Sequence, residues 1–346
     1  MPYNNIIHVG NQNVIKWGGS LFLFSLLFFS NLVIGSTSLS LSQIFDALFN
    51  QGTPDFVTHF IVVETRLPAA ATATLAGGSL AVIGLLLQAS FHNPLADPGL
   101  LGVSGGASLG AAISILLIGI NYSSAEAAIG FSVTILSAFM GAIIVALLLF
   151  LCNKLFKNSL ILLLFGVLLS YTLNAIVTML NFQASADNLR SFFSWQMGDF
   201  SSLTLSDLPI FALLSFAGCL LALTQIKPLN LLRMGDDYAR NAGIHARSFR
   251  AITLLVAGLL TATVTAFCGP IAYIGLVTPH FTRILFHTSD YRSLLPLSIL
   301  WGGSIALLCN LISSLPGANG LIPINTTSSI LSLPFLILLL LRWSKK

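Results

Sequence analysis

Long apolar stretches recur along almost the whole chain, and they restrict its fold more than any other feature. A helix of about twenty apolar residues crosses the roughly 30 Å hydrocarbon layer of a bilayer. Only 8% of the 346 residues are charged, whereas a soluble domain carries about 25%, so too few polar side chains remain to cover a soluble core. We therefore predict an all-α polytopic membrane protein with about ten transmembrane helices. The predicted spans lie near Trp17–Gly35, Leu67–Gln88, Leu100–Ile120, Ala128–Cys152, Leu160–Phe182, Leu208–Ile226, Phe249–Gly269, Ile274–Phe286, Leu294–Leu315 and Ile322–Trp343.

Basic residues are distributed unevenly between the predicted connections. With the N-terminus inside and ten crossings, thirteen of the fifteen lysines and arginines fall on the inner side, and only Arg66 and Arg190 fall outside. Cytoplasmic connections carry such an excess of positive charge. The net charge of +4 is therefore assigned to contact with lipid phosphates, not with nucleic acid. We expect a single transmembrane domain at 17–343 between cytoplasmic tails at 1–16 and 344–346.

The sequence predicts no bound cofactor, metal or enzymatic site. The four cysteines are isolated within apolar runs and have neither metal-site nor disulfide spacing. His280 and His287 could share a helix face, but no further ligand joins them, and His280 is expected to form a hydrogen bond at the cytoplasmic end of a half-helix. No Gly-Lys pair occurs, so there is no phosphate-binding loop of the Gly-x-x-x-x-Gly-Lys type. A step driven by ATP would need another polypeptide.

The apolar pattern is interrupted at 90–110, where the sequence reads SFHNPLADPGLLGVSGGASLG. Its prolines lack an N–H group and forbid a continuous helix, while its first glycines permit sharp turns. The later glycines recur every fourth residue and offer a small-residue face for close helix packing. This stretch is predicted to be a tight cytoplasmic re-entry followed by a packing helix. The residues assigned to this break and packing are Asn93, Pro94, Asp97, Pro98, Gly102 and Gly106.

A second break, Gly269-Pro270-Ile271-Ala272, follows the seventh span as Asn93-Pro94-Leu95-Ala96 follows the second. Each break precedes a Gly-Leu pair. Five crossings separate the breaks, so they are expected on opposite faces of the membrane. Irregular backbone at paired positions of oppositely oriented halves is typical of an inverted-repeat transporter. The residues assigned to this second break and its packing are Gly269, Pro270, Gly275 and Pro279.

Three blocks of the sequence resemble the permease subunits of ABC importers for iron–siderophores, haem and vitamin B12, the FecCD type. The first runs from Arg66-Leu67-Pro68 to Leu101-Gly102, the second from Leu229 to Ile244, and the third from Gly269 to Arg283. The resemblance implies a second permease subunit, as a homodimer or heterodimer, on two ATP-binding subunits in the bacterial inner membrane. It also implies a periplasmic substrate-binding protein outside, and both termini are expected in the cytoplasm.

The second block lies in the cytoplasmic segment 227–250. Asp236 or Asp237 could cap a short helix there, and Ala239 and Gly243 could leave one side of it open to a partner. The resemblance implies that this helix sits in a cleft of the ATPase and transmits its closure, whereas a solvated turn is the alternative. The residues assigned to coupling are Gly235, Asp236, Asp237, Ala239 and Gly243.

The outer face departs from the family pattern in several places. The resemblance implies that Arg66 receives an acidic residue of the binding protein, but Ala69 stands where the family has a second arginine. Asn310 and Ser314 stand where an Asp and an Arg are expected. Later motifs are altered as well, which places conventional docking of a binding protein in question. The altered positions of those later motifs include Leu321, Asn325 and Ser332.

Two polar residues within the spans are candidates for the transport pathway. Gln88 lies near the cytoplasmic end of the second span and Asn174 lies within the fifth. A polar side chain in hydrocarbon needs a partner or a pathway. Hydrogen bonding between helices is the alternative for both.

The predicted function is import of an iron chelate by alternating access, with a siderophore favoured over haem or cobalamin. The alternative is a secondary transporter driven by an ion gradient, which also uses inverted repeats. Such a carrier is expected to place acidic residues in mid-membrane, yet all eleven acidic residues fall in predicted connections or at span ends. An intramembrane enzyme would need clustered nucleophiles, carboxylates or metal ligands within the spans, and the sequence offers none.

Overall fold

The computed structural model describes residues 3–49, 55–119, 127–156, 158–315 and 322–343, and within these ranges all regular structure is helical. Six helical stretches are long and apolar enough to cross a bilayer, a bent pair of helices forms a seventh, and two shorter apolar stretches follow. Together with one 13-residue helix, α13, they match the ten predicted spans one for one. Their main helices are α1 (Tyr3–Val33), α4 (Leu67–Ser90), α5 (Val103–Ala112), α6 (Ala127–Leu155), α7 (Ser159–Gln183), α9 (Leu208–Thr224), α12 (Ala246–Cys268), α13 (Ile274–Phe286), α14 (Tyr291–Ser313) and α15 (Ile324–Trp343).

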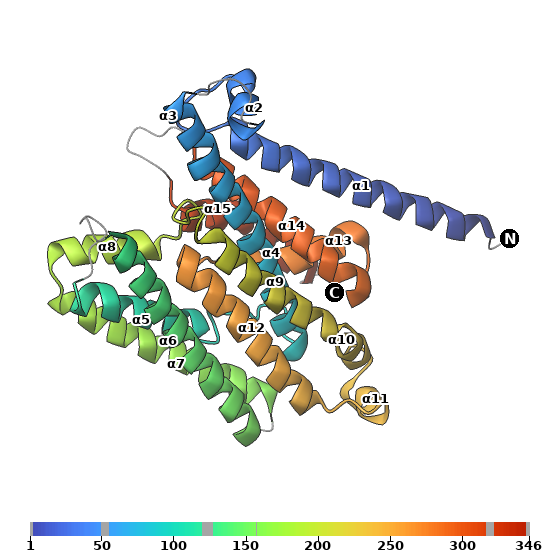
Figure 1. Ribbon diagram of the computed structural model, residues 1–346. Coiled ribbons are helices and arrows are strands. Elements are labelled where there is room, and N and C mark those ends of the chain that lie inside the picture. The colour runs from blue at the N-terminus through green and yellow to red at the C-terminus, as the bar shows by residue number, and fades with distance from the viewer. Residues whose placement is uncertain (1–2, 50–54, 120–126, 157, 316–321, 344–346) are drawn as a thin grey trace.

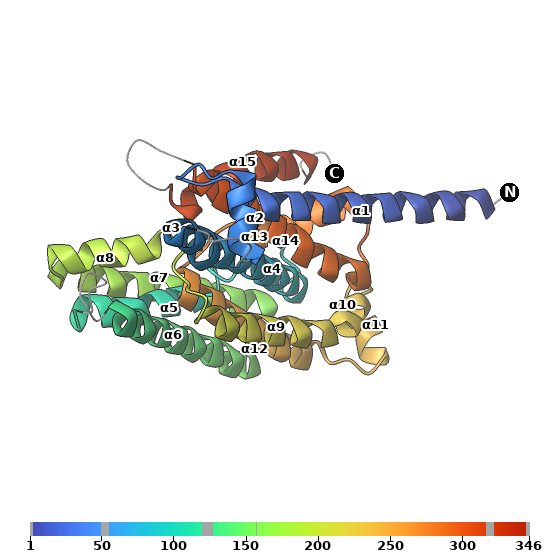
Figure 2. The same ribbon diagram turned by 45° about the horizontal axis from the view of Figure 1, so that its top comes forward.

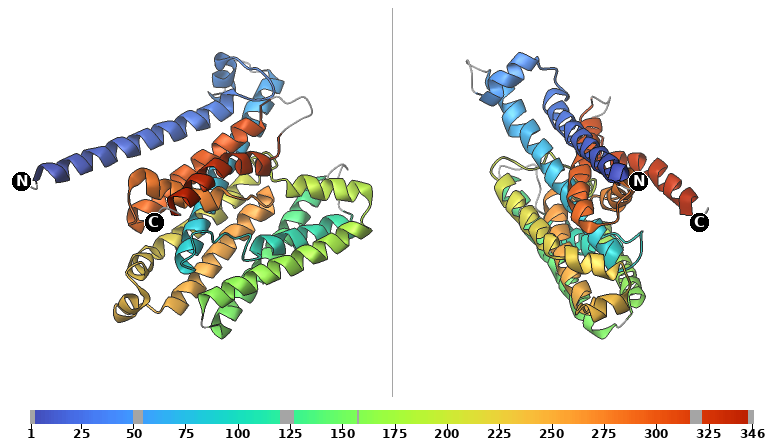
Figure 3. Two further views of the ribbon diagram at one scale, coloured as in Figure 1. Left: turned by 180° about the vertical axis from the view of Figure 1, so that it is seen from behind. Right: turned by 90° about the vertical axis from the view of Figure 1, so that its right-hand side faces the viewer.

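Several elements differ from the sequence-based expectation. Helix α1 begins at Tyr3, so most of the expected N-terminal tail is helical and its N-terminal end extends away from the bundle (Figure 3). The predicted tail at 344–346 lies outside the described residues. The connection after α1, which is predicted to lie outside, contains α2 (Leu41–Phe49), α3 (Phe56–His59) and a π-helical turn, η1 (Phe60–Arg66), none of which was expected.

Two central helices, α4 and α12, run in opposite directions through the middle of the bundle (Figure 1). Helix α4 packs on α14 and α13, whereas α12 packs on α6 and α5, and the two central helices pack on each other. Each central helix therefore packs on the two helices that follow the other one in the sequence. This pattern relates α4–α5–α6 to α12–α13–α14, as an inverted repeat requires. Helices α5, α6 and α7 lie on one side of the central pair, while α1, α14 and α15 lie on the other (Figure 2).

Glycines allow these helices to cross closely. A Cβ atom added at Gly84 of α4 would overlap the carbonyl oxygen of Gly275 of α13. In the same way, a Cβ at Gly106 of α5 would approach the Gly141 oxygen to 2.5 Å, and one at Gly110 would overlap the Ser137 oxygen on α6. Two of the three recurring glycines, Gly106 and Gly110, thus lie at a close crossing with α6, whereas Gly102 lies against α7.

The outward face of α6 consists of large apolar side chains. Such a face is unfavourable in water and suits contact with acyl chains or with another apolar subunit. The exposed large side chains on this helix are Leu136, Met140, Ile144, Leu147, Leu148, Leu151 and Leu155.

Candidate functional site

Two hydrogen bonds from backbone N–H groups to side chains stabilise the turns of the break after α4. The Leu95 N–H donates to Asn93 Oδ1 at 2.9 Å, and the Gly99 N–H donates to Asp97 Oδ1 at 2.8 Å. Gly102 then adopts φ +83°, where only glycine is unstrained, and α5 starts one residue later. The chain therefore re-enters the bundle at Val103, and the predicted break is confirmed.

Asp97 is an ionisable residue within this break. Burial raises the pKa of its carboxyl to about 6, while the hydrogen bond from the Gly99 N–H acts in the opposite direction. The aspartate oxygen therefore serves as an acceptor for the turn, and its ionised form is disfavoured by the surroundings.

Three hydrogen bonds tie the break and the end of α4 to α13. His280 Nε2 lies 2.8 Å from the Pro94 oxygen, and because a carbonyl only accepts, Nε2 carries the hydrogen. Gln88 Nε2 donates to the Leu276 oxygen at 3.1 Å, and Arg283 Nη1 donates to Gln88 Oε1 at 3.2 Å. The expected hydrogen bond of His280 is confirmed. Gln88 is buried between helices with its amide engaged, so the helix-packing alternative describes it and a pathway role is not supported.

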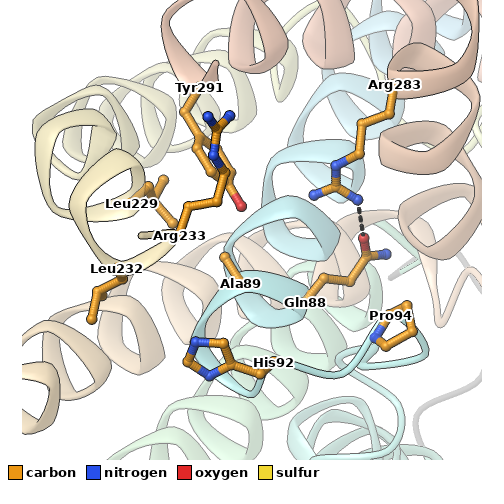
Figure 4. A pocket seen from close by; sticks show the side chains of 9 residues that line it. All are labelled: Gln88, Ala89, His92, Pro94, Leu229, Leu232, Arg233, Arg283 and Tyr291. Carbon is orange, nitrogen blue, oxygen red and sulfur yellow. Dashed lines mark hydrogen bonds between the residues drawn. The ribbon is translucent and has the colours of Figure 1, made fainter. Parts of the chain in front are cut away.

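A hollow of about 280 Å³ opens beside these contacts on the predicted cytoplasmic side. Figure 4 shows Arg283 and Arg233 on two sides of it, with Gln88 bonded to Arg283. Two guanidinium groups thus line one hollow, and none of its lining residues is a carboxylate. Its lining residues are Gln88, Ala89, His92, Pro94, Leu229, Leu232, Arg233, Arg283 and Tyr291.

The segment 227–250, which is predicted to be cytoplasmic, contains most of α10 (Ile226–Leu232) and all of α11 (Asp236–Asn241). Gly235 precedes α11 with φ +113°, so it occupies the cap position, and the two aspartates are the first helical residues. A glycine, and not Asp236 or Asp237, therefore occupies the cap position. Negative charge in a first helical turn is favourable in itself.

Helix α11 presents a different face from the one predicted. Ala239 is fully buried within the chain, so it cannot form the side that a partner approaches. Gly243 ends the segment with φ +82° in open space. The exposed side is formed by Asp237, Tyr238 and Arg240.

A polar bridge joins α10 to the start of α14. Asn230 Nδ2 donates to Asp290 Oδ1 at 2.8 Å, and the Tyr291 N–H donates to Asn230 Oδ1 at 3.1 Å. The hydrogen bond from the Arg292 N–H and that from Asn230 lower the pKa of the Asp290 carboxyl. Asn230 belongs to the second block of the family resemblance, but the sequence assigns it no partner, because nothing local shows that it faces a residue 60 positions away.

The break after α12 lies at the other end of the bundle. Gly269 follows α12 with φ +73°, and a Cβ there would overlap the Trp195 oxygen at the end of α8 (Ala186–Gln196). The Asn325 side chain, at the start of α15, bonds to the backbone on both sides of this contact. Both predicted breaks are therefore present, and each is held by a side chain from a distant segment.

Arg66 is turned into the protein. Its guanidinium is buried and donates to the carbonyl oxygens of Leu32 and Val33, both at 2.9 Å, and to the Thr37 oxygen at 2.5 Å. Arg66 thus fixes the position of the backbone at the end of α1 and just after it. This geometry does not support the expected direct contact of Arg66 with a binding protein.

Asn174 remains a candidate for the pathway. It is exposed on α7 of the single chain, in a helix whose residues are mostly apolar. Among the described residues, no group of three or more His, Cys, Asp or Glu side chains could hold a metal ion.

Comparisons with known proteins agree with this architecture. The model of the FecCD transport family matches residues 23–342. The hemin transport system permease protein HmuU of Yersinia pestis is 32% identical over 92% of this chain and 94% of its own length. The vitamin B12 import system permease protein BtuC of Photorhabdus laumondii is 33% identical over 93% and 92% of the two chains.

A solved structure described as an inward-facing conformation of an ABC transporter assigned to the metal-chelate type is also similar. It is 27% identical, with a TM-score of 0.81 over 95% of this chain and 99% of that one. The family model and the two permease relatives span nearly the whole sequence. This chain belongs to the FecCD transport family.

Proposed function

We propose that this chain is the membrane-spanning permease subunit of an ABC importer for an iron chelate. The named relatives carry hemin and vitamin B12, and the similar solved structure is assigned to the metal-chelate type. All of these are large cargoes compared with a single ion. Within the metal-chelate class we favour a ferric siderophore, and haem and cobalamin, which is a cobalt chelate, are the other candidates.

The proposal is supported by a continuous series of contacts between packed helices. It begins at α11, passes through α10 to α14 by way of Asn230, and includes the adjoining α13. From α13 it reaches the break after α4 through the bond between His280 and Pro94. Packed elements joined in this way can transmit a displacement. A push on α11 would therefore move the break that begins the re-entrant helix α5.

Two ATP-binding subunits would supply that push from the cytoplasmic side. The exposed side of α11 and the neighbouring hollow with Arg233 and Arg283 offer them a contact surface, which basic residues would favour for an acidic partner. Both termini would then be cytoplasmic, as the distribution of basic residues predicts. The permease itself would carry out no covalent chemistry.

A second permease subunit would complete the pathway. Asn174 is exposed on α7, where a polar group facing acyl chains would be costly. Placing this face toward a second copy or a homologous subunit, across a central pathway, removes that cost. A periplasmic binding protein would deliver the chelate to the outer end by contacts that do not depend directly on Arg66.

Uptake into proteoliposomes tests this function. The chain is reconstituted with its cognate ATP-binding subunit and binding protein, and uptake of a radiolabelled ferric siderophore, hemin and cobalamin is measured. Uptake that requires hydrolysable ATP supports the proposal, and the preferred cargo is read from the three rates. Uptake that continues without ATP and stops with an uncoupler would instead establish the gradient-driven alternative.

A further inference from the structure

Three segments meet at the outer end of the bundle around the side chain of Asn325. Asn325 Nδ2 donates to the Gln196 oxygen at the end of α8 at 3.2 Å, and to the Pro270 oxygen in the break after α12 at 2.7 Å. Its Oδ1 accepts from the Ala272 N–H at 3.1 Å. The Asn325 N–H also donates to the Met197 oxygen at 3.3 Å. One amide thus joins α8, the break and α15.

An amide side chain suits this position because it offers two donors and one acceptor at once. The two carbonyl oxygens need donors, and the Ala272 N–H needs an acceptor. An aspartate would place negative oxygens against two carbonyl oxygens, and a glycine or alanine would leave all three groups without this partner. The residue at 325 therefore determines how firmly the three segments are held together.

The contact that Asn325 secures is also tight. The backbone of Gly269 lies against the Trp195 oxygen and Gly198, so no side chain fits between the end of α8 and the break. The Asp199 N–H adds a bond of 2.9 Å to the Cys268 oxygen. Cys268, the last residue of α12, is only 2% exposed beneath this contact. Separation of α8 from the break would uncover it.

We propose that Asn325 is a positioning residue that keeps the outer end of the transport pathway closed, by fastening the break after α12 to the end of α8. Helix α8 follows α7, which carries the exposed Asn174, so fixing α8 also fixes the outer end of α7. Opening toward the outside then requires the three side-chain bonds to be released together. This inference rests on the proposed transport function, but its first test, the labelling of one cysteine, requires neither cargo nor ATP.

Labelling of Cys268 tests the inference. The other cysteines, Cys152, Cys219 and Cys309, are replaced by alanine, and a membrane-impermeant maleimide is added to right-side-out vesicles. The unsubstituted Asn325 protein should label slowly, and Asn325→Ala and Asn325→Asp should label at least about tenfold faster, a ratio that corresponds to about 1.4 kcal/mol. If these variants elute as folded protein in gel filtration but label at the rate of the unsubstituted protein, the inference is overturned.

Asn310→Ala is the matched control. Asn310 also uses its amide between helices, donating to Asn31 Oδ1 at 2.9 Å, but it does not touch the break. It should label at the unsubstituted rate, and equal acceleration in this control would show general loosening and contradict the inference. If Asn325→Ala fails to fold, Asn325→Ser should give intermediate labelling, and an unchanged rate there would count against the inference.

A nucleotide-dependent readout separates a gating role from a merely structural one. In the complex with the ATP-binding subunit, labelling of the Asn325 protein should differ between the nucleotide-free and ATP-bound states. Asn325→Ala should label rapidly in both states. Equal labelling of the Asn325 protein in both states would contradict a gating role. Failure of chelate uptake would count against the proposed function but would leave the outcome of the nucleotide-free labelling experiment unaffected.

Discussion

His280 Nε2 lies 2.8 Å from the carbonyl oxygen of Pro94, across 186 residues of sequence. This bond joins the break after α4 to α13, its neighbour from the second half of the inverted repeat. His280→Ala would leave the oxygen without its donor and is expected to lower the free energy of unfolding by about 1–3 kcal/mol. It should also reduce transport more than stability alone explains, because the connection from α11 to the break is weakened.

The measurement is uptake per unit of ATP hydrolysed by the reconstituted complex, together with its melting temperature. His280→Gln, which keeps an N–H donor, should recover part of the transport. Equal uptake by the Ala variant and the unsubstituted protein would show that this bond does not take part in coupling.

Two adjacent glycines on α5 allow a direct test of helix packing. A Cβ at Gly106 would approach the Gly141 oxygen to 2.5 Å, whereas a Cβ at Gly105 would only make an ordinary contact of 3.5 Å with Leu173. Gly106→Ala is expected to lower the unfolding free energy by about 1–3 kcal/mol through overpacking. Gly105→Ala should be neutral or slightly stabilising, because alanine favours a helix. Similar melting temperatures for the two variants would contradict the close crossing of α5 and α6.

The stability of the first break should depend on pH. Burial raises the pKa of Asp97 to about 6 in the folded protein. A carboxyl with a raised pKa favours folding most below its unfolded pKa, and this contribution is lost as pH rises through about 6. Asp97→Asn keeps an oxygen that can accept from the Gly99 N–H but cannot ionise. It should therefore gain melting temperature relative to the unsubstituted protein between pH 5 and pH 8.

Thermal unfolding across that pH range gives the comparison. The difference between the two proteins should amount to a few degrees at pH 8 and shrink toward pH 5. A difference that does not change with pH would mean that Asp97 is not the titrating group at this turn.

Arg66 is expected to stabilise the folded protein and not to contact the binding protein. Its buried guanidinium donates to three backbone oxygens, so Arg66→Gln should cost about 2 kcal/mol or more of unfolding free energy. Arg190→Gln is the matched control, since Arg190 is the other predicted outer arginine and its side chain is exposed. Melting temperatures separate the two variants. Loss of binding-protein affinity in Arg66→Gln without loss of stability would restore the docking role.

The spans and breaks could be predicted because their causes are local. The length of an apolar run limits helix length, and the prolines and positive-φ glycines of the two breaks lie where helices stop or start. Pro279, Pro296 and Pro334 instead lie inside helices. The predicted bounds of α13, Ile274–Phe286, match the structure residue for residue. The recurrence of Gly106 and Gly110 on one face also predicted a close helix contact, although the sequence could not name α6 as its partner.

Site residues that depend on distant contacts were harder to predict. Asn325 could be noted only as a departure from the family pattern, because its partners lie 53 to 129 residues away. Arg66 was assigned to docking because the family resemblance implies that role, yet its guanidinium donates to backbone carbonyl oxygens at and after the end of α1. Ala239 was placed on an open side of α11, but tertiary packing decides which face of so short a helix is buried.

The central claim is that α11 contacts an ATP-hydrolysing subunit in the cytoplasm. A photo-crosslinking side chain at Tyr238, which is 53% exposed on α11, tests this claim most directly in the complex purified from membranes. The same group at Ser201, near the opposite end of the bundle, serves as the control. We predict a crosslink to the ATP-binding subunit from position 238 and none from position 201. No crosslink from position 238, together with its modification by an impermeant reagent from outside the cell, would contradict the claim.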